Sequence, residues 1–177
     1  MILIRTIFAG ALAALTLFLA GCVSNPPLPV RPSTAAVTGF SFTGRIAVRQ
    51  GETRHHAKLD WHHGNAGDEI LVTTPLGQGV AEITRDASGA RLLLADQRRF
   101  YAADWSELSQ EVFGFRLPLK ASAHWLLGNE ADTEGWRISV IERESTAPDA
   151  LPTLIELEHG REDISVRLKI DEWSEVR

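Results

Sequence analysis

Four histidines close together are the residues of this sequence whose type most suggests chemistry. His55 and His56 are adjacent, and His62 and His63 follow in the same segment. Imidazole is a common zinc ligand, but all ligands of one ion lie about 2 Å from it. The alternating pattern predicts a strand, on which His55 and His56 point to opposite faces and His56 and His62 are ~20 Å apart. One ion cannot span that distance, so we expect no metal site and interpret the four histidines as solvated.

Motifs for catalysis are not found in the sequence. It contains neither the G-x-S-x-G elbow of a serine hydrolase nor a P-loop. Gly77-Gln78-Gly79 begins like a dinucleotide-binding loop, but Glu82 stands where the third glycine would be. Carboxylates are frequent, yet the sequence alone places no pair of them face to face. We therefore predict a protein that is not an enzyme, with no catalytic residue and no cofactor.

Cys22 is the only cysteine of the chain. A lone thiol forms no internal disulfide, so in an oxidising compartment it is either buried or chemically used. Upstream, Arg5 precedes an apolar run that is too short to span a bilayer, which is the layout of a secretory signal. Leu19-Ala20-Gly21-Cys22 resembles a bacterial lipobox, which implies a lipid on the Cys22 thiol. We expect residues 1–21 to be a lipoprotein signal peptide.

Residues 22–38 are predicted to be a tether that carries the lipidated cysteine. Four prolines recur in this segment, with Ser, Thr and Asn between them. Pro-rich chain is extended by about 3 Å per residue, so the segment can hold a domain up to ~45 Å from its anchor. Lipoproteins retained in the inner membrane commonly have Asp after the lipidated cysteine, and this chain has Val23 there. By resemblance, the expected location is the outer membrane, with the domain facing the periplasm.

Size and charge limit what the rest of the chain binds. About 155 residues remain after the signal, which suits one domain with its own core. The whole chain carries a net charge of −5 and contains no run rich in Lys and Arg. The electrostatic footprint of a nucleic-acid-binding protein is missing, so we expect no nucleic-acid partner.

From Gly39 onward, apolar and polar residues alternate, which is the pattern of half-buried strands. In the first strand, Phe40, Phe42, Ile46 and Val48 share one parity. The expected strands cover residues 39–49, 56–62, 69–74, 80–85, 90–95, 99–102, 136–142, 153–158 and 164–173. Residues 63–67 are expected to form a loop. Short strands joined by turns of Gly, Asn and Asp predict an antiparallel meander.

Two helices are predicted to interrupt the strands. Asp104-Trp105-Ser106-Glu107 resembles a capping box, and apolar residues recur at helical spacing from Trp105 until Gly114. A second helix is expected from Pro118 to Gly128. A sheet with one apolar face and two apolar-faced helices predicts an α+β domain, which we assign to residues 39–177.

The tryptophans allow two interpretations. Trp61, Trp105, Trp125 and Trp136 each lie at or beside an apolar position of a predicted element. Such residues either fill a packed core or line an apolar cavity. Periodicity does not distinguish these arrangements.

Motifs along the whole domain resemble the LolB family of outer-membrane lipoprotein receptors. In chain order they are Phe42-x-Gly44-Arg45-Ile46-Ala47-Val48, Trp61, Pro75-Leu76-Gly77, Leu117-Pro118-Leu119, Trp125-Leu126-Leu127-Gly128, Gly135-Trp136 and Leu168-Lys169-Ile170-x-x-Trp173. The resemblance implies an incomplete antiparallel β-barrel, a strongly curved sheet with helices covering an apolar cavity. Two segments are shorter than the family's pattern: the one before Phe42 and the connection from Gly128 to Trp136.

The resemblance also implies a function and its residues. A LolB-type receptor takes lipoproteins from the periplasmic carrier LolA and inserts them into the inner leaflet of the outer membrane. The expected partners of this monomer are therefore LolA, acylated lipoprotein cargo and outer-membrane phospholipid. The expected acyl-chain cavity is lined by Ile46, Val48, Leu59, Trp61, Trp125, Leu126, Leu168 and Ile170. Pro75, Leu76 and Gly77 form the expected membrane-insertion loop; without the resemblance, Leu76 is only an ordinary exposed leucine.

Two other functions stay open from the sequence. An anchored lipoprotein of related fold would bind another hydrophobic ligand or serve as an envelope assembly partner. A lipoprotein hydrolase would need a nucleophile and a base that the sequence does not reveal.

Overall fold

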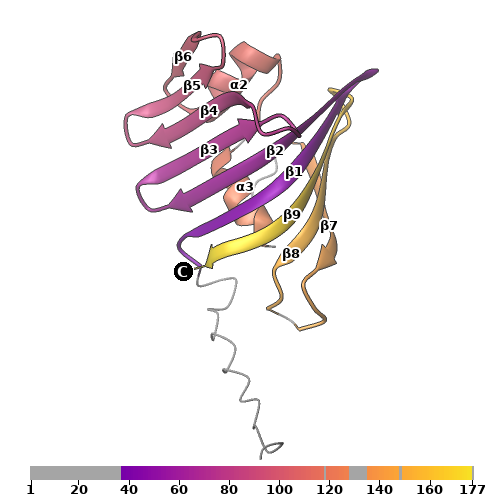
Figure 1. The fold of residues 1–177 in the computed structure, drawn as a ribbon. Coiled ribbons are helices and arrows are strands. Elements are labelled where there is room, and N and C mark those ends of the chain that lie inside the picture. Colours follow the sequence, from indigo (N-terminus) through magenta and orange to yellow (C-terminus); the bar gives the residue numbers. More distant parts are fainter. Residues whose placement is uncertain (1–36, 118, 128–134, 148, 177) are drawn as a thin grey trace, which may run out of the picture. The chain divides into compact units, whose positions relative to one another are not determined.

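The computed structural model describes residues 37–117, 119–127, 135–147 and 149–176. The predicted signal peptide, Cys22 and the tether up to residue 36 lie outside the described residues. So do Pro118 and Gly128, the expected limits of the second helix. The described part of the chain forms one nine-stranded sheet and two helices (Figure 1).

The sheet is antiparallel throughout, as the sequence predicts. Its strands are β1 Phe40–Gln50, β2 Thr53–Gly64, β3 Gly67–Thr73, β4 Gly79–Asp86, β5 Gly89–Leu94, β6 Arg99–Ala102, β7 Trp136–Arg143, β8 Pro152–His159 and β9 Ile164–Val176. They lie side by side in the order β6-β5-β4-β3-β2-β1-β9-β8-β7. The sheet is curved, and its edge strands β6 and β7 do not pair, so the curve stays unclosed (Figure 1).

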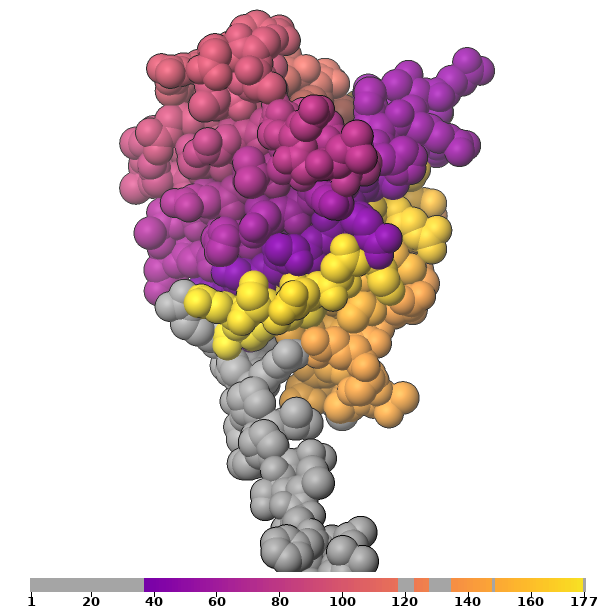
Figure 2. Space-filling view, in the orientation of Figure 1, coloured from indigo at the N-terminus to yellow at the C-terminus, as the bar shows by residue number. Residues whose placement is uncertain are grey.

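Strand β1 is the centre of the sheet. It pairs along its whole length with β2 on one side and with β9 on the other. Because β2 pairs with β3 only from Lys58 onward, the β1–β2 hairpin projects beyond β3 (Figure 2). The chain thus forms a meander from β1 to β6, and β9 brings a second meander, β7 to β9, back against β1.

Alternation along each strand creates two faces of different character. We call the face that carries Phe40 and Phe42 the inner face, and the face that carries Arg45 and Arg49 the outer face. The inner face supplies the strand residues of a single apolar cluster, which the helices α2 (Trp105–Phe113) and α3 (Leu119–Leu126) join through Trp105, Leu108 and Trp125. Both helices lie on the inner side of the sheet (Figure 1). Neither described helix is long and apolar enough to cross a membrane.

The first helix begins and ends where the sequence predicts. Asp104 caps α2, because its Oδ1 accepts a hydrogen bond of 2.9 Å from the backbone N–H of Glu107. At the other end Gly114 adopts the left-handed conformation, with φ of 81°. Ser109 then fixes the exit of the chain, since its buried Oγ accepts a 2.8 Å hydrogen bond from the N–H of Leu117.

The expected loop at residues 63–67 is wrong. Strand β2 continues to Gly64 and β3 begins at Gly67, so only Asn65 and Ala66 form the turn. The physical reason is a polar pair across the strands: His63 lies opposite Asp68, and the two side chains are hydrogen-bonded. This pairing holds both strands together up to the turn.

An irregularity in β9 decides where Trp173 points. From Ile164 to Ile170 the even-numbered residues face inward, so strict alternation would place Trp173 on the outer face. The register between β1 and β9 shifts between Gly44 and Thr43, which brings Trp173 opposite Phe42 on the inner face, and it shifts again between Phe42 and Ser41. Such a bulge re-aims a side chain without ending the strand, and β9 continues three residues past Trp173 to Val176.

The close approach of β1 to β9 at Gly44 makes a testable prediction. A Cβ added at Gly44 would lie 2.5 Å from the carbonyl oxygen of Lys169, whereas one added at Gly64 meets nothing within 4 Å. We expect Gly44→Ala to lower the free energy of unfolding by about 1–3 kcal/mol, the usual cost of overpacking. Gly64→Ala is the matched control and should stay near wild type. Thermal unfolding of both full-length variants tests this; equal melting temperatures would contradict it.

Candidate functional site

The inner face is closed at one end by aromatic packing. One row of paired residues crosses the sheet there and is buried throughout: Trp173, Phe42, Trp61, Ile70, Ile83 and Leu92. The rings of Phe42 and Trp173 are 5.1 Å apart, and Phe40 meets the ring of Trp61 edge-on at 5.5 Å. Edge-to-face contacts of this kind add to the free energy of burial. We call this part of the inner face the closed end.

Toward the β1–β2 turn the inner face stays apolar, but on β1 and on β3 to β5 it is less buried, whereas Val166 and Leu168 of β9 stay buried. Several side chains there are aliphatic and only partly covered: Ile46, Val48, Val72, Ala81 and Leu94. They continue the cluster of the closed end without the aromatic rings that fill it. We call this part of the inner face the open end.

The structure brings all eight predicted cavity residues into this one apolar cluster. Six of them are buried, namely Leu59, Trp61, Trp125, Leu126, Leu168 and Ile170. The other two, Ile46 and Val48, are partly buried members of the open end. The strand members share the inner face because Ile46 pairs with Leu168, and Gly44 pairs with both Leu59 and Ile170.

Hydrogen bonds separate the tryptophans into two kinds. The indole N–H groups of Trp61 and Trp173 donate to Asp68 Oδ1 at 2.9 Å and to the carbonyl of Pro152 at 3.0 Å. The N–H of Trp136 donates to the carbonyl of Arg116 at 3.3 Å. Trp125, which is 2% exposed, has a buried N–H without a partner among the described residues. The indole N–H groups of Trp61, Trp136 and Trp173 are therefore engaged within the fold, whereas the buried N–H of Trp125 is available to a ligand.

The loop from β3 to β4 presents Leu76 to solvent. Leu76 is 90% exposed. Below it the loop is tightly closed: the N–H of Gly77 donates to the carbonyl of Thr74 at 2.9 Å, and the N–H of Thr74 donates to the carbonyl of Gln78 at 2.8 Å. Pro75 suits the second position of this turn, and Gly77 suits its left-handed φ of 88°. The leucine thus stands on a rigid support.

This loop and the open end lie at the same end of the strands. Thr73, the last residue of β3, pairs with Lys58, and the chain continues from there toward the β1–β2 turn. The half-buried Ile46 and Val48 lie on β1 in the same direction. Leu76 therefore projects from the end of the sheet at which Ile46 and Val48 are only partly covered.

Comparison with known proteins places this arrangement in a family. The family model described as "Outer membrane lipoprotein LolB" matches residues 38–134, more than half of the chain. The chain is 32% identical to the outer-membrane lipoprotein LolB of Azoarcus sp. (strain BH72), an alignment that covers 94% of this chain and 95% of that protein. It is also 32% identical to the LolB of Chromobacterium violaceum, over 92% of this chain and 96% of that protein.

The chain belongs to the LolB family. The members are outer-membrane lipoproteins, so the family, the receptor role and the outer-membrane location predicted from the sequence are confirmed. LolB is a family of receptors and not of enzymes. A solved structure of a LolA superfamily protein from Nitrosomonas europaea is also similar, with 10% identity and a TM-score of 0.43 over 77% of this chain and 85% of that one.

Sequence reasoning missed one buried polar cluster of this LolB-family chain. Asp68 has a fully buried side chain, and its carboxylate accepts hydrogen bonds from Trp61 at 2.9 Å, from His63 Nδ1 at 2.6 Å and from Arg85 Nε at 2.6 Å. The expectation of four solvated histidines is thus wrong for His63, which is largely covered. No set of three or more His, Cys, Asp and Glu side chains among the described residues could hold a metal ion. The cluster closes the inner face beside Phe40.

The charge of Asp68 is stabilised by its partners. Burial by itself disfavours the carboxylate, but the hydrogen bonds from His63 and Trp61, with the positive charges of His63 and Arg85, outweigh it. Together they hold the pKa of Asp68 below its ordinary value. A group with a depressed pKa in the folded state stabilises the protein above its unfolded pKa and loses that contribution as the pH falls through the folded value.

We predict that Asp68→Asn lowers the free energy of unfolding by about 2–3 kcal/mol at neutral pH. Breaking a buried ion pair costs more than this when both partners are fully buried, but Arg85 and His63 are partly exposed. The variant should also lose less stability than wild type when the pH is lowered below about 4. Asp60→Asn is the control, because among the described residues Asp60 forms an ion pair only with the exposed His62. Thermal melts across pH decide this, and equal effects of the two substitutions would refute a stabilising role for the cluster.

Proposed function

We propose that this LolB-family chain accepts acylated lipoproteins from the carrier LolA into an apolar cavity beneath α2 and α3, and inserts them into the inner leaflet of the outer membrane. The observation that carries the proposal is the uneven covering of the inner face. Aromatic rings fill the closed end, while aliphatic side chains of β1 and β3 to β5 at the open end are only partly buried. Acyl chains need an apolar lining that is not already packed, and the open end offers one.

The energetics favour a receptor that transfers its cargo without an external source of energy. Each methylene that leaves water contributes about 0.8 kcal/mol, so an acyl chain must always be covered during transfer. Cargo then moves only toward the site that binds it better. The apolar lining proposed here, from Ile46 and Val48 to Trp125 and Leu168, supplies affinity without catalytic groups.

Trp125 would contribute specificity within the cavity. A buried donor without a partner costs about 1–3 kcal/mol. The ester and amide carbonyls at the head of a lipoprotein's acyl chains are acceptors of the right kind. We propose that Trp125 donates to one of them, which would align the cargo.

The anchor and the membrane loop would act at opposite ends of the sheet. We propose that residues 1–21 are removed, that Cys22 carries lipid and that residues 22–38 tether the monomeric domain. The chain enters the sheet at Phe40, in the closed end, whereas Leu76 stands beyond the open end. In this proposal Pro75 and Gly77 hold Leu76 outward so that it enters the bilayer during delivery. One buried leucine contributes about 1.5–3 kcal/mol, enough for transient docking.

We predict that Trp125→Phe weakens binding of an acylated peptide about five- to tenfold, the worth of one hydrogen bond. Trp173→Phe is the control that removes the same ring volume. It should reduce stability more, because it also leaves the carbonyl of Pro152 unpaired. Cargo binding and thermal unfolding are measured for both. Unchanged cargo affinity of Trp125→Phe would show that its N–H does not contact cargo.

We predict that Leu76→Glu accepts cargo from loaded carrier at the wild-type rate but inserts it into liposomes at least tenfold more slowly, because the leucine that would enter the bilayer is replaced by a charge. Tyr101→Glu, which introduces the same charge at an exposed apolar residue near the closed end, should be normal in both steps. Acceptance and insertion are assayed separately. Failure of acceptance with normal insertion, or two normal steps, would exclude the membrane role of the loop.

A further inference from the structure

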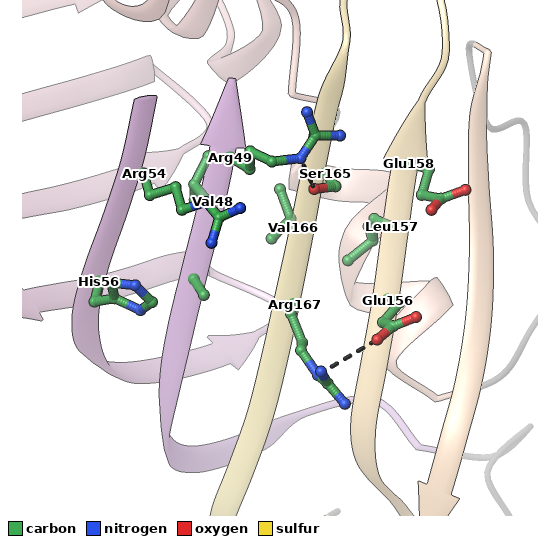
Figure 3. A pocket seen from close by; sticks show the side chains of 11 residues that line it. Val48, Arg49, Arg54, His56, Glu156, Leu157, Glu158, Ser165, Val166 and Arg167 are labelled. Carbon is green, nitrogen blue, oxygen red and sulfur yellow. Dashed lines mark hydrogen bonds and ion pairs between the residues drawn. The ribbon is translucent and has the colours of Figure 1, made fainter. Parts of the chain in front are cut away.

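The outer face carries a groove beside the Leu76 loop. The groove has a volume of about 440 Å³ and is lined by Arg45, His56, Lys58, Pro75, Arg167 and Lys169, among others. Pro75 belongs to the loop that presents Leu76, so loop and groove are contiguous. A second hollow, which shares His56 and Arg167, continues toward the β1–β2 turn (Figure 3). We call the two together the outer groove.

Most cations of the outer groove are already neutralised. Six Lys and Arg side chains line it, and four of them pair with carboxylates: Arg45 with Asp171, Arg49 with Asp163, Arg167 with Glu156, and Lys169 with Glu142. Among the described residues, Lys58 and Arg54 have no such partner, and neither does His56 between them. The nearest acid on their strand, Asp60, is engaged with His62 at 3.2 Å.

The unpaired charge lies on the side of the groove that faces the loop. Arg54, His56 and Lys58 alternate along β2, which places all three on the outer face. Figure 3 shows Arg54 and His56 along one side of the groove, and Glu156 and Glu158 on β8 along the other. Lys58 pairs across the strands with Thr73, directly before the loop. A chain with a net charge of −5 therefore has free positive charge near Leu76, the most exposed leucine of the described residues.

We propose that the outer groove binds the phosphate groups of anionic phospholipids, with Lys58 and Arg54 as the charged contacts. The inference rests on the proposed membrane role of Leu76 and extends it. Binding at a bilayer surface combines buried apolar area with attraction to anionic headgroups, and here both elements occur within one contiguous surface. The groove holds the headgroup layer while Leu76 reaches the acyl chains, which orients the open end toward the leaflet.

The test uses the full-length, lipid-modified chain reconstituted into vesicles. Thr73→Cys adds a thiol on the outer face beside Lys58. Because the lipid occupies the thiol of Cys22, the introduced cysteine has the only free thiol. A fluorophore on this thiol is quenched by spin-labelled headgroups when the outer groove approaches the bilayer. Vesicles contain phosphatidylcholine alone or with phosphatidylglycerol. We expect stronger quenching with the anionic lipid, and loss of the difference in about 0.5 M salt, where the Debye length is about 4 Å.

Removal of the two free cations is the decisive comparison. Each Lys or Arg near an anionic surface strengthens binding roughly fivefold, so Lys58→Gln with Arg54→Gln should abolish most of the lipid-dependent quenching. Arg99→Gln with Arg116→Gln removes the same charge from exposed residues away from the groove and should change nothing. Equal quenching in the two double variants, or in neutral and anionic vesicles, would overturn the proposal.

Further measurements separate this site from other ligands and from the proposed function. Inorganic phosphate should reduce the quenching no more than chloride does at equal ionic strength. A specific effect of phosphate would assign the groove to a free anion instead. The Lys58→Gln and Arg54→Gln pair should accept cargo from the carrier normally, and slow acceptance would assign the groove to the carrier and refute lipid binding. Leu76→Glu could insert cargo normally while Lys58 and Arg54 still controlled the quenching. That result would support lipid binding by the groove and refute the membrane role of Leu76.

Discussion

The pairing of β1 with β9 is the contact on which the rest of the structure depends. It joins the meander β1 to β6 to the meander β7 to β9, two groups of strands that the two helices separate along the chain. Gly44 allows the strands to approach closely, and Arg45 ties the same region to Asp171 through a two-pronged ion pair. Without this seam each meander would expose one flank of its apolar face. With it, the inner face becomes one continuous curved surface.

The inner face is covered unevenly, and this difference between its two ends suits the proposed binding of acyl chains. The closed end is rigid, because aromatic rings interlock there and the Asp68 cluster ties β2, β3 and β4 together with satisfied hydrogen bonds. Toward the open end the lining changes to Ile, Val, Ala and Leu, and on β1 and β3 to β5 it is less covered. A receptor for acyl chains needs both properties, since a fully packed interior would leave no room and a loose one would not fold.

The charges of the outer face favour membrane contact at the same end of the sheet. Four of its six groove cations are paired, and the two that remain lie on β2, where Lys58 pairs with Thr73 directly before the loop that presents Leu76. Apolar and cationic groups of this kind together favour the interface of a bilayer over its interior. The end of the sheet that opens the inner face is thus also the end with the chemistry to meet lipid.

The sequence by itself determined the local features of this protein. Period-two alternation predicted the antiparallel strands, Asp104 and Gly114 predicted the limits of the first helix, and ordered motifs identified the family, because each of these signals is carried by residues close together in the chain. Only the tertiary structure decided the rest. The bulge that turns Trp173 inward breaks the alternation on which sequence reasoning relies. His63 pairs with Asp68 only because the register of β2 and β3 places the two residues opposite each other. This pairing extends the strands into residues for which the sequence predicted a loop. Which tryptophan keeps a free N–H, and which cations stay unpaired, depends on neighbours contributed by distant strands, and no local pattern records them.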